Sequence, residues 1–532
     1  MNPPLVTRSL REPRESLCVA LLVVSWTAAA WAAEPPGDGV GPPVDGCEVP
    51  LAVSGLPAGG LPAPVTCDVD LATLVQRLGQ SGAVDERSVR LFHVLPDGSL
   101  REQPIQLLAR PQPRAAQRQF LPTTVSGVSY LAEAVAAEAA TAVAASGQLW
   151  WLAQGDAEGR AAYRLRFGVL RRGRAIQVPY PPQNWRMFDD QDRATPLAYV
   201  PRMQIRPQWP LDGVLHVAEN AVPVTSYHVG PLLDSAEASG TPQGPAGHSG
   251  PTIRRPFFYP VNGPDGLSLT EFGKPHDPTG SHRHHYSLWI AHNDVAGHNF
   301  WADNGGLILH KEIVLLEDGP VFCRLVVRTR WRDGALDLLD EERTVTVFAA
   351  SEGFRLMDIE LQLRPAGQEP VELGQTTFGF LAVRVAQSLT PFDGGGEILN
   401  ARGQRNEQNV HLQRAEWLDQ SGPILPDRWS GIAMLDHPAN PNHPTLWHCR
   451  NDGWAGAAFC GEKPYTIAAD QPLRLRYRLV VHGGDAVRGR VADHWRAYAA
   501  TPVVRLGEIA GPAPQAFRTQ EGCSQRVIDG GL

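Results

Sequence analysis

Two seven-residue runs of strictly alternating apolar and polar residues constrain the fold of this chain most strongly. They are Met357–Leu363 and Leu473–Leu479. Because successive side chains of a strand point to opposite faces, each run predicts a β-strand with one buried face. Turn signals at Glu317–Pro320, Arg332–Gly334 and Ser351–Gly353 separate neighbouring runs. The pattern therefore predicts an antiparallel meander of strands.

The fold class that the sequence predicts is all-β, with a large antiparallel β-sandwich preceded by a smaller β-sandwich domain. The smaller domain is expected at residues 47–175, where short extended runs alternate with turns. A connector rich in Pro, Asp and Arg follows at 176–200, and the large sandwich is expected at 201–500. One helix is expected near its end, at Val491–Ala500, and residues 501–532 are expected to form a tail.

The N-terminal 32 residues have the pattern of an export signal. Three arginines precede an apolar stretch at 17–30, and Ala30–Ala32 fits a small-x-small cleavage site. The alternative is an uncleaved anchor, although the stretch is short for a membrane span, which needs about 20 residues. We therefore expect a periplasmic or extracellular protein that starts near Ala33, with a disordered leader at 33–46 and no membrane span in the mature chain.

Charge and cysteine content exclude some partners and sites. The formal net charge of −8 argues against nucleic acid as a partner. Of the seven cysteines, Cys18 lies in the signal, and export permits disulfides among the other six. Cys47–Cys67 and Cys449–Cys460 are the closest pairs in sequence, and other pairings stay open. No Cys-x-x-Cys motif occurs, which argues against a thiolate zinc site.

Histidines concentrate in one short segment, which holds seven of the 17: His276, His282, His284, His285, His292, His298 and His310. On a strand, His282 and His284 would share one face and His285 would point to the other. A third ligand from His292 or His298 would complete a divalent metal site. Two alternatives are acid–base or substrate contacts without metal, and a polar loop network without a functional role.

A second polar segment, Leu435–Arg450, is stiffened by three prolines. It holds six groups with little value for packing: Asp436, His437, Asn440, His443, His448 and Arg450. Arg450 could bind a substrate carboxylate through two parallel hydrogen bonds. The alternative is a rigid rim loop whose side chains satisfy one another. We expect His284, His292 and His448 to line one pocket, with Arg450 at its edge.

No serine elbow, phosphate loop or dinucleotide motif occurs, so serine-hydrolase, kinase and Rossmann-type functions have no support. A glycosidase usually needs two carboxyl groups beside the scissile bond. Carboxylates are scattered through the larger domain, and the sequence alone does not pair them.

Several motifs in one order carry a family resemblance. They include Arg255–Pro260, His282-x-His284-His285, His292-x-Asp294, Trp417-x-Asp419 and Trp447-His448-x-Arg450. Over residues 201–500 the chain resembles an exported bacterial family of unknown function labelled "methane oxygenase PmoA". The resemblance implies a large β-sandwich, similar to the galactose mutarotase supersandwich, and a carbohydrate-processing setting. The label does not imply methane oxidation, since that membrane subunit needs transmembrane helices. The family's usual Asp-His-Pro-His-His-Arg appears here as Ser281–Tyr286, without the acid and the last base.

Together these features predict a secreted, carbohydrate-active protein that binds and cleaves or modifies a glycan in a cleft of the larger domain. The expected acid–base groups, or ligands of a possible divalent metal, are His282, His284, His285, His292 and His448. The expected substrate-binding residues are Arg450, Trp289, Trp301, Trp447, Asp436 and Asn440. The alternatives are a non-catalytic glycan-binding protein, which needs no groups with shifted pKa values, and a copper or iron oxidative enzyme with histidine ligands.

Overall fold

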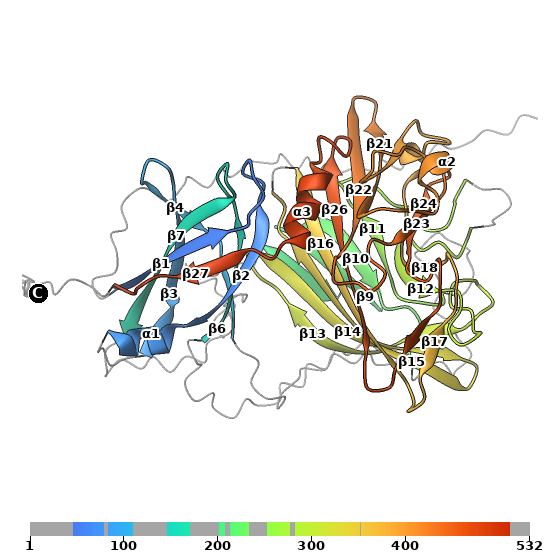
Figure 1. Cartoon of the computed structure of the whole chain (residues 1–532), viewed down its shortest axis with the longest axis horizontal. Helices are drawn as coiled ribbons and strands as arrows, with labels where there is room; N and C mark the ends of the chain where they lie inside the picture. Colours follow the sequence, from blue (N-terminus) through green and yellow to red (C-terminus); the bar gives the residue numbers. More distant parts are fainter. Residues whose placement is uncertain are drawn as a thin grey trace, which may run out of the picture. The chain divides into compact units, whose positions relative to one another are not determined.

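The computed structural model describes residues 46–78, 83–109, 146–170, 202–207, 213–233, 253–276, 282–351 and 353–510 (Figure 1). The predicted signal peptide (1–32), nearly all of the leader (33–46), the connector (176–200) and the end of the tail (511–532) lie outside these residues. Among the described residues, no helix is long and apolar enough to cross a membrane. The described part is built mainly of antiparallel sheets, which confirms the predicted all-β class.

The first region is the predicted smaller β-sandwich. Its two sheets have the strand orders β27-β1-β7-β3-β4 and β2-β6-β5. One hydrophobic core joins them, with Val49, Leu165 and Trp151 all fully buried. The elements are β1 (Gly46–Ser54), β2 (Ala63–Asp70), α1 (Leu71–Arg77), β3 (Ala83–Val94), β4 (Leu100–Gln103), β5 (Gln106–Ala109), β6 (Ser146–Ala153) and β7 (Arg160–Leu170).

The segment after residue 500, expected to be a tail, contributes a strand to this first sandwich. β27 (Val503–Leu506) pairs antiparallel with β1, from Leu51 opposite Leu506 to Ser54 opposite Val503. Figure 1 shows this pairing as a red strand beside a blue one. A four-residue edge strand carries too little alternation to be recognised in sequence. The two ends of the described chain therefore meet in one sheet.

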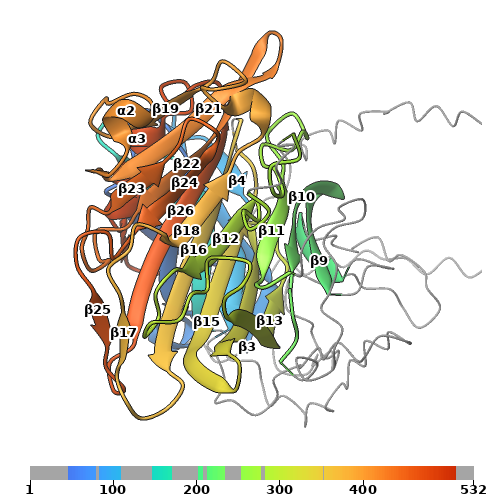
Figure 2. The ribbon, with the colours of Figure 1, turned by 90° about the vertical axis from the view of Figure 1, so that its right-hand side faces the viewer.

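The larger sandwich consists of two antiparallel sheets. The nine-stranded sheet has the order β20 (Gln413–Arg414), β23 (Leu446–Cys449), β24 (Trp454–Ala458), β18 (Gly379–Arg384), β12 (Leu288–His292), β11 (Phe257–Val261), β10 (Val222–His228), β9 (Val214–Glu219) and β8 (Met203–Pro207). The eight-stranded sheet has the order β13 (Leu307–Glu317), β14 (Phe322–Asp333), β15 (Leu336–Phe348), β16 (Phe354–Pro365), β26 (Leu473–Gly483), β22 (Arg428–Asp436), β21 (Trp417–Leu425) and β19 (Glu397–Asn400). Figure 2 shows β23, β24, β18, β12 and β11 side by side.

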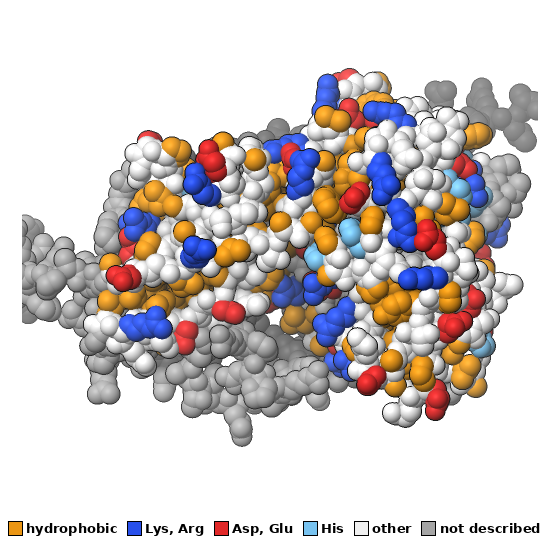
Figure 3. Space-filling view, viewed as in Figure 1, with side chains coloured by type: hydrophobic (Ala, Val, Ile, Leu, Met, Phe, Trp, Pro, Cys, Tyr) orange, Lys and Arg blue, Asp and Glu red, His pale blue; other side chains and the backbone are white. Residues whose placement is uncertain are grey.

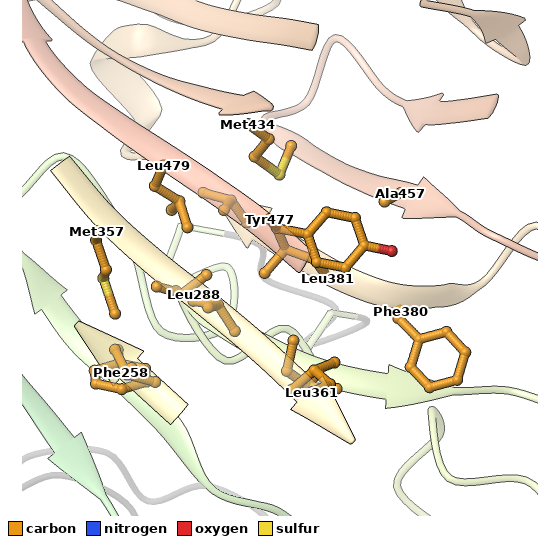
Figure 4. Packing of buried hydrophobic residues seen from close by; sticks show 14 of the residues in the cluster. Phe258, Leu288, Met357, Leu361, Phe380, Leu381, Met434, Ala457, Tyr477 and Leu479 are labelled. Atoms are coloured by element: carbon orange, nitrogen blue, oxygen red, sulfur yellow. The ribbon is translucent and has the colours of Figure 1, made fainter. Parts of the chain in front are cut away.

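The two alternating runs form β16 and β26, as predicted. Their apolar side chains face the nine-stranded sheet and enter the main core (Figure 4). Met357 and Leu361 from β16 and Leu479 from β26 lie in the same cluster as Phe258 and Leu288 from the opposite sheet. Each such side chain contributes about 1.5–3 kcal/mol on full burial. Alternation along single strands therefore produces the core between two stacked sheets.

Smaller elements complete the larger sandwich: β17 (Val371–Leu373) paired with β25 (Tyr465–Ile467), the 3-10 helix η1 (Gln387–Leu389), α2 (Glu407–Val410) and α3 (Val491–Ala499). α3 confirms the predicted helix to within one residue. It packs on the outer face of the eight-stranded sheet, where Val491 joins Leu435 and Val480 in a buried cluster. On the same face, His482 of β26 contacts Asp419 of β21 at 2.8 Å, and both side chains are fully buried.

The described residues contain no disulfide, neither at the two closest pairs in sequence nor elsewhere, since Cys47, Cys67, Cys323, Cys449 and Cys460 are all free. Cys47 lies on β1 and Cys67 on β2, which belong to different sheets. A disulfide requires an S–S separation of about 2.05 Å, and closeness in sequence does not provide it. Burial raises the pKa of the Cys449 thiol to about 12, so this side chain behaves as a small apolar group.

Candidate functional site

A cavity of about 470 Å³ lies against the outer face of the nine-stranded sheet. This volume is within the usual range of small-molecule sites, about 300–1,000 Å³. The residues that line the cavity are His282, His284, His285, Phe378, Phe392, Glu407, His448, Arg450, Asn451, Asp452 and Trp454. They come from the turn before β12, the start of β18, the loop after η1, α2 and the β23–β24 hairpin. Histidine side chains also reach the molecular surface over the larger sandwich (Figure 3).

Strand alternation on β23 decides which predicted residues reach the cavity. Trp447 and Cys449 point into the main core, so His448 between them points to the outer face. The Trp447 indole donates a hydrogen bond to the backbone carbonyl of Ala415 at 2.8 Å, and its side chain is fully buried. Trp447 therefore does not line the cavity, contrary to its predicted role as a substrate-binding residue.

The same alternation on β12 places His292 on the wrong face for the cavity. Leu288 and Ile290 lie in the main core, and His292 follows them at the next alternate position. Its ring stacks on Phe380 with centroids 5.0 Å apart, and its Nε2 atom donates to the Gly374 carbonyl at 3.3 Å. His292 therefore does not share a pocket with His284 and His448, contrary to the sequence prediction.

The segment His282–His285 forms a turn and not the strand that the alternating histidines suggested. The turn nevertheless gathers the three rings. The centroids of His282 and His285 are 5.1 Å apart, and those of His284 and His285 are 4.5 Å apart. His285 stacks on the indole of Trp289 at 5.3 Å. Because Trp289 and Trp301 are 1% and 3% exposed, they form the floor beneath His285 and do not line the cavity.

His285 is held in one tautomer by a buried arginine. Arg384 of β18 donates from its Nη1 atom to His285 Nδ1 at 3.0 Å. Burial, followed by the electrostatic effects of His284 and Arg384, lowers the pKa of His285 well below its usual value. The ring is therefore neutral, accepts through Nδ1 and carries its proton on Nε2.

His284 is the least constrained imidazole of the cavity. It is half-buried, and its ring nitrogens have no hydrogen-bond partner in the part of the chain that the structure describes. Burial and the neighbouring Arg255, His282 and Arg384 lower the pKa of His284 to about 4. At neutral pH its ring is uncharged and offers a lone pair.

His448 forms a wall of the cavity together with aromatic rings. Its Nδ1 atom donates to the Thr377 carbonyl at 3.2 Å, and its ring lies 4.3 Å from Trp454 and 4.8 Å from Phe378. Burial, followed by His411, lowers the pKa of His448 to about 4. The donation from Nδ1 leaves the lone pair on Nε2, which is buried without a partner among the described residues.

Two carboxylates line the cavity, and both are engaged by cations. Asp452 lies 3.4 Å from Lys274 Nζ and 3.8 Å from Arg384 and from His282. Glu407 accepts from Arg450 Nη1 at 2.7 Å. Arg450, predicted to bind a substrate carboxylate, thus already has an internal partner.

Asp436 and Asn440 do not belong to the cavity. Asp436 accepts hydrogen bonds from Asn440 at 2.7 Å, His443 at 2.7 Å and the Thr445 amide at 2.9 Å. Asn440 also accepts from the Arg476 amide at 2.7 Å. These side chains use their hydrogen-bonding groups on one another, as expected for the alternative of a rigid rim loop. Asp436 and Asn440 therefore do not reach the cavity, contrary to their predicted role as substrate-binding residues.

Sequence reasoning missed four residues that help to complete the cavity, namely Phe378, Phe392, Glu407 and Asp452. Phe392 is 74% exposed, unusual for a phenylalanine. Its amide donates to the Asn451 carbonyl at 3.1 Å, which holds its loop beside the β23–β24 hairpin. The turn signal Asn451-Asp452-Gly453, directly after Arg450, was available in the sequence and could have marked Asp452.

The histidine cluster does not have the arrangement of a metal centre. No group of three or more His, Cys, Asp or Glu residues that could hold a metal ion occurs in the described ranges. The rings of His282 and His284 lie 5.1 and 4.5 Å from that of His285, which bonds to Arg384, and Asp452 lies beside Lys274 and Arg384. The cavity therefore presents neutral acceptors and ion pairs rather than converging ligands.

The fold and cavity define an all-β protein with a polar cavity on one sheet of a large sandwich. The model of a family of unknown function, DUF6807, matches residues 215–496, and the chain belongs to this family. The resemblance to the family labelled methane oxygenase PmoA is corrected by this match. The search of curated proteins gave no match.

Among solved structures, the chain is similar to a glycosyl hydrolase family 38 protein from Enterococcus faecalis, with 10% identity and a TM-score of 0.36. This match covers 86% of this chain and 47% of that one. An α-mannosidase from E. faecalis V583 matches at 9% identity and a TM-score of 0.32, covering 86% and 46%. Heparinase III, the BT4657 gene product, matches at 10% identity and 0.24, covering 54% and 37%. The chain thus spans less than half the length of these proteins, and scores this low carry no argument about activity.

Proposed function

We propose that this chain binds a glycan with one sugar residue in the cavity and modifies that sugar with His284 as the proton acceptor. The observation that carries the proposal is the half-buried His284 ring, which lacks a hydrogen-bond partner among the described residues and lies in an aromatic-walled cavity. A sugar ring has apolar faces that suit Phe378 and Phe392. Its hydroxyl edges suit a neutral imidazole and a carboxylate.

The charge state of the cavity favours base-assisted chemistry over hydrolysis by two carboxyl groups. A glycosidase of the usual kind needs one protonated carboxylic acid beside the bond. Here Asp452 and Glu407 both form ion pairs with cations. Burial and cationic neighbours keep His284 neutral, with a pKa of about 4. The groups at hand are two ion-paired carboxylates and a neutral imidazole with a free lone pair, so none of them is a protonated carboxylic acid beside a leaving group.

The second candidate is a non-catalytic glycan-binding protein. Its support is the same pKa of about 4, because a weakly basic imidazole accepts a hydrogen bond from a hydroxyl more readily than it removes a proton. A histidine-ligated oxidative enzyme has no such support in the described residues.

The test is a glycan array followed by calorimetry and product analysis with the glycans that bind. His284→Ala should abolish turnover and weaken binding at least about tenfold, a loss of about 1.4 kcal/mol. The matched control is His298→Ala, since His298 belongs to the same histidine run but bonds to Asp333 at 2.8 Å and does not line the cavity. Binding without turnover would favour the second candidate, and no binding to any glycan would refute both.

We also propose that the protein is exported, on the strength of the signal-like residues 1–32. Export would bring the cavity into contact with glycans outside the cytoplasm. Mass spectrometry of the protein from its native host should find an N-terminus near Ala33. A retained Met1 would contradict this.

A further inference from the structure

The His285 ring is fixed in position by contacts on its face and at one nitrogen. It stacks on Trp289 with the ring centroids 5.3 Å apart and the planes at 21°. On β18, Arg384 donates to its Nδ1 atom at 3.0 Å. The side chain is 2% exposed and lines the cavity. The ring therefore has one orientation before any ligand arrives.

The proton of this fixed ring lies on Nε2. Arginine donates hydrogen bonds and accepts none, so the Nδ1 atom that faces Arg384 carries the lone pair. Burial, followed by the neighbouring His284 and Arg384, lowers the pKa of His285 well below its usual value, so the ring does not take up a second proton. His285 is therefore a neutral hydrogen-bond donor with a single donor atom.

The Nε2–H group of His285 opens onto the cavity. In the part of the chain that the structure describes it has no acceptor, and no hydrogen bond joins it to His284. The Nε2 atom of His448 also lacks a partner, but that atom is sealed from solvent, whereas Nε2 of His285 is not. Since the rest of the His285 side chain is enclosed, its small exposed part includes this atom. An N–H group in this position is available to a ligand in the cavity.

His284 places a complementary group beside this donor. The two rings meet edge to face, with centroids 4.5 Å apart and planes at 78°. The His284 ring is neutral, because burial and Arg255 lower its pKa to about 4, and it offers a lone pair. A fixed N–H and a lone pair thus lie side by side in the wall of the cavity. Two adjacent hydroxyl groups of a sugar match such a pair, since each hydroxyl can both accept and donate.

We propose that His285 is a specificity-determining donor, whose Nε2–H binds one oxygen of the bound sugar while the adjacent hydroxyl group donates to His284. This inference rests on the proposed function, because it assumes that the ligand is a sugar in contact with His284. A donor that is fixed before binding requires no reorganisation when the ligand arrives. A sugar without that oxygen would leave the N–H of His285 unpaired, so the cavity should reject the corresponding deoxy sugar.

Neutron diffraction from crystals soaked in D2O locates the proton directly and needs no ligand. A deuteron on Nε2 of His285, with none on Nδ1, is the expected result. A deuteron on Nδ1 would overturn the inference and leave the role proposed for His284 untouched, so failure here is distinct from failure of the proposed function.

A matched pair of variants tests the donor in binding. His285→Gln keeps an acceptor for Arg384 and an N–H for the ligand, whereas His285→Glu keeps only the acceptor. The ligand is whichever of methyl galactoside, methyl glucoside and methyl mannoside binds most tightly in calorimetry. His285→Gln should bind it within about threefold of the wild type, and His285→Glu about tenfold more weakly. His298→Gln is the control, because His298 bonds to Asp333 at 2.8 Å outside the cavity, and its affinity should not change.

The monodeoxy analogues of the same glycoside link the loss to one oxygen. One of them should bind the wild type about tenfold more weakly than the parent glycoside, and His285→Glu should no longer distinguish the two. Equal affinities of His285→Gln and His285→Glu, or a deoxy penalty that survives unchanged in His285→Glu, would overturn the inference, while the glycan array still decides the proposed function. Binding of none of the three glycosides would overturn it as well.

Discussion

Two histidines on opposite outer faces of the larger sandwich show how their surroundings determine what a buried imidazole does. His482 contacts the Asp419 carboxylate at 2.8 Å, and both are fully buried. Burial alone would lower the pKa of His482, but Asp419 raises it above its usual value. His284 lies beside a cavity, with Arg255 and Arg384 near it, and its pKa falls to about 4. One imidazole is thus paired with a carboxylate that favours its charged form, and the other is a neutral group with an unused lone pair.

The substitution Asp419→Asn is the most severe test of this difference between His482 and His284. Removing one partner of a buried ion pair costs about 3–5 kcal/mol, because His482 loses the carboxylate that stabilises its charged form and must either release its proton or stay charged without a counter-ion. Chemical denaturation should therefore show a loss of this size in the free energy of unfolding. Asp470→Asn, at an exposed turn position, should change it by less than about 0.5 kcal/mol. An equally small loss for both variants would mean that the Asp419–His482 pair is not a major source of stability.

His284→Ala should show the opposite pattern, with a small loss of stability and a large loss of glycan affinity. Because its ring is half-buried and makes no hydrogen bond with a described residue, the free energy of unfolding should fall by less than about 1 kcal/mol. Glycan affinity should nevertheless fall about tenfold or more, or about 1.4 kcal/mol. Calorimetry and denaturation on the same preparation measure both quantities. A large stability loss with unchanged affinity would place His284 with His482 as a structural residue.

The pH dependence should also separate the two histidines. A raised pKa in the folded state means that protonated His482 contributes stability below the unfolded value of about 6.5, and that this contribution is lost as pH rises through the folded value. Stability of the wild type should therefore decline above neutral pH more steeply than that of Asp419→Asn. Glycan binding should be lost as pH falls towards 4, where His284 becomes charged and can no longer accept a hydrogen bond. Parallel pH profiles for the wild type and Asp419→Asn would contradict the first expectation.

How far the sequence predicted this arrangement depended on whether the relevant signal was local. Alternation within Met357–Leu363 depends only on neighbouring residues, so β16 was correctly predicted. The opposite orientations of Trp447 and His448 follow from the same rule, but only once β23 is known to be a strand. The meeting of His284 with Asp452 depends on pairing between distant segments, which no local pattern encodes. The turn at His282 was missed because the alternating histidines were given more weight than the turn-forming residues Pro278, Gly280 and Ser281 directly before it.

The smallest effect is expected at Phe392, which tests whether the rim of the cavity contributes to binding. Its side chain is 74% exposed, so Phe392→Ala removes little buried area and should leave the free energy of unfolding within about 0.5 kcal/mol of the wild type. If the ring stacks on the apolar face of a sugar, its loss should cost about 0.5–1.5 kcal/mol of binding, or roughly three- to tenfold in affinity. Phe392→Tyr retains the stacking surface and should bind nearly as well as the wild type.

The matched control is Val487→Ala, since Val487 is equally exposed at 74% but does not line the cavity. Calorimetry with one glycan ligand on all three variants separates the outcomes. Equal affinities for Phe392→Ala and Val487→Ala would confine recognition to the histidine side of the cavity.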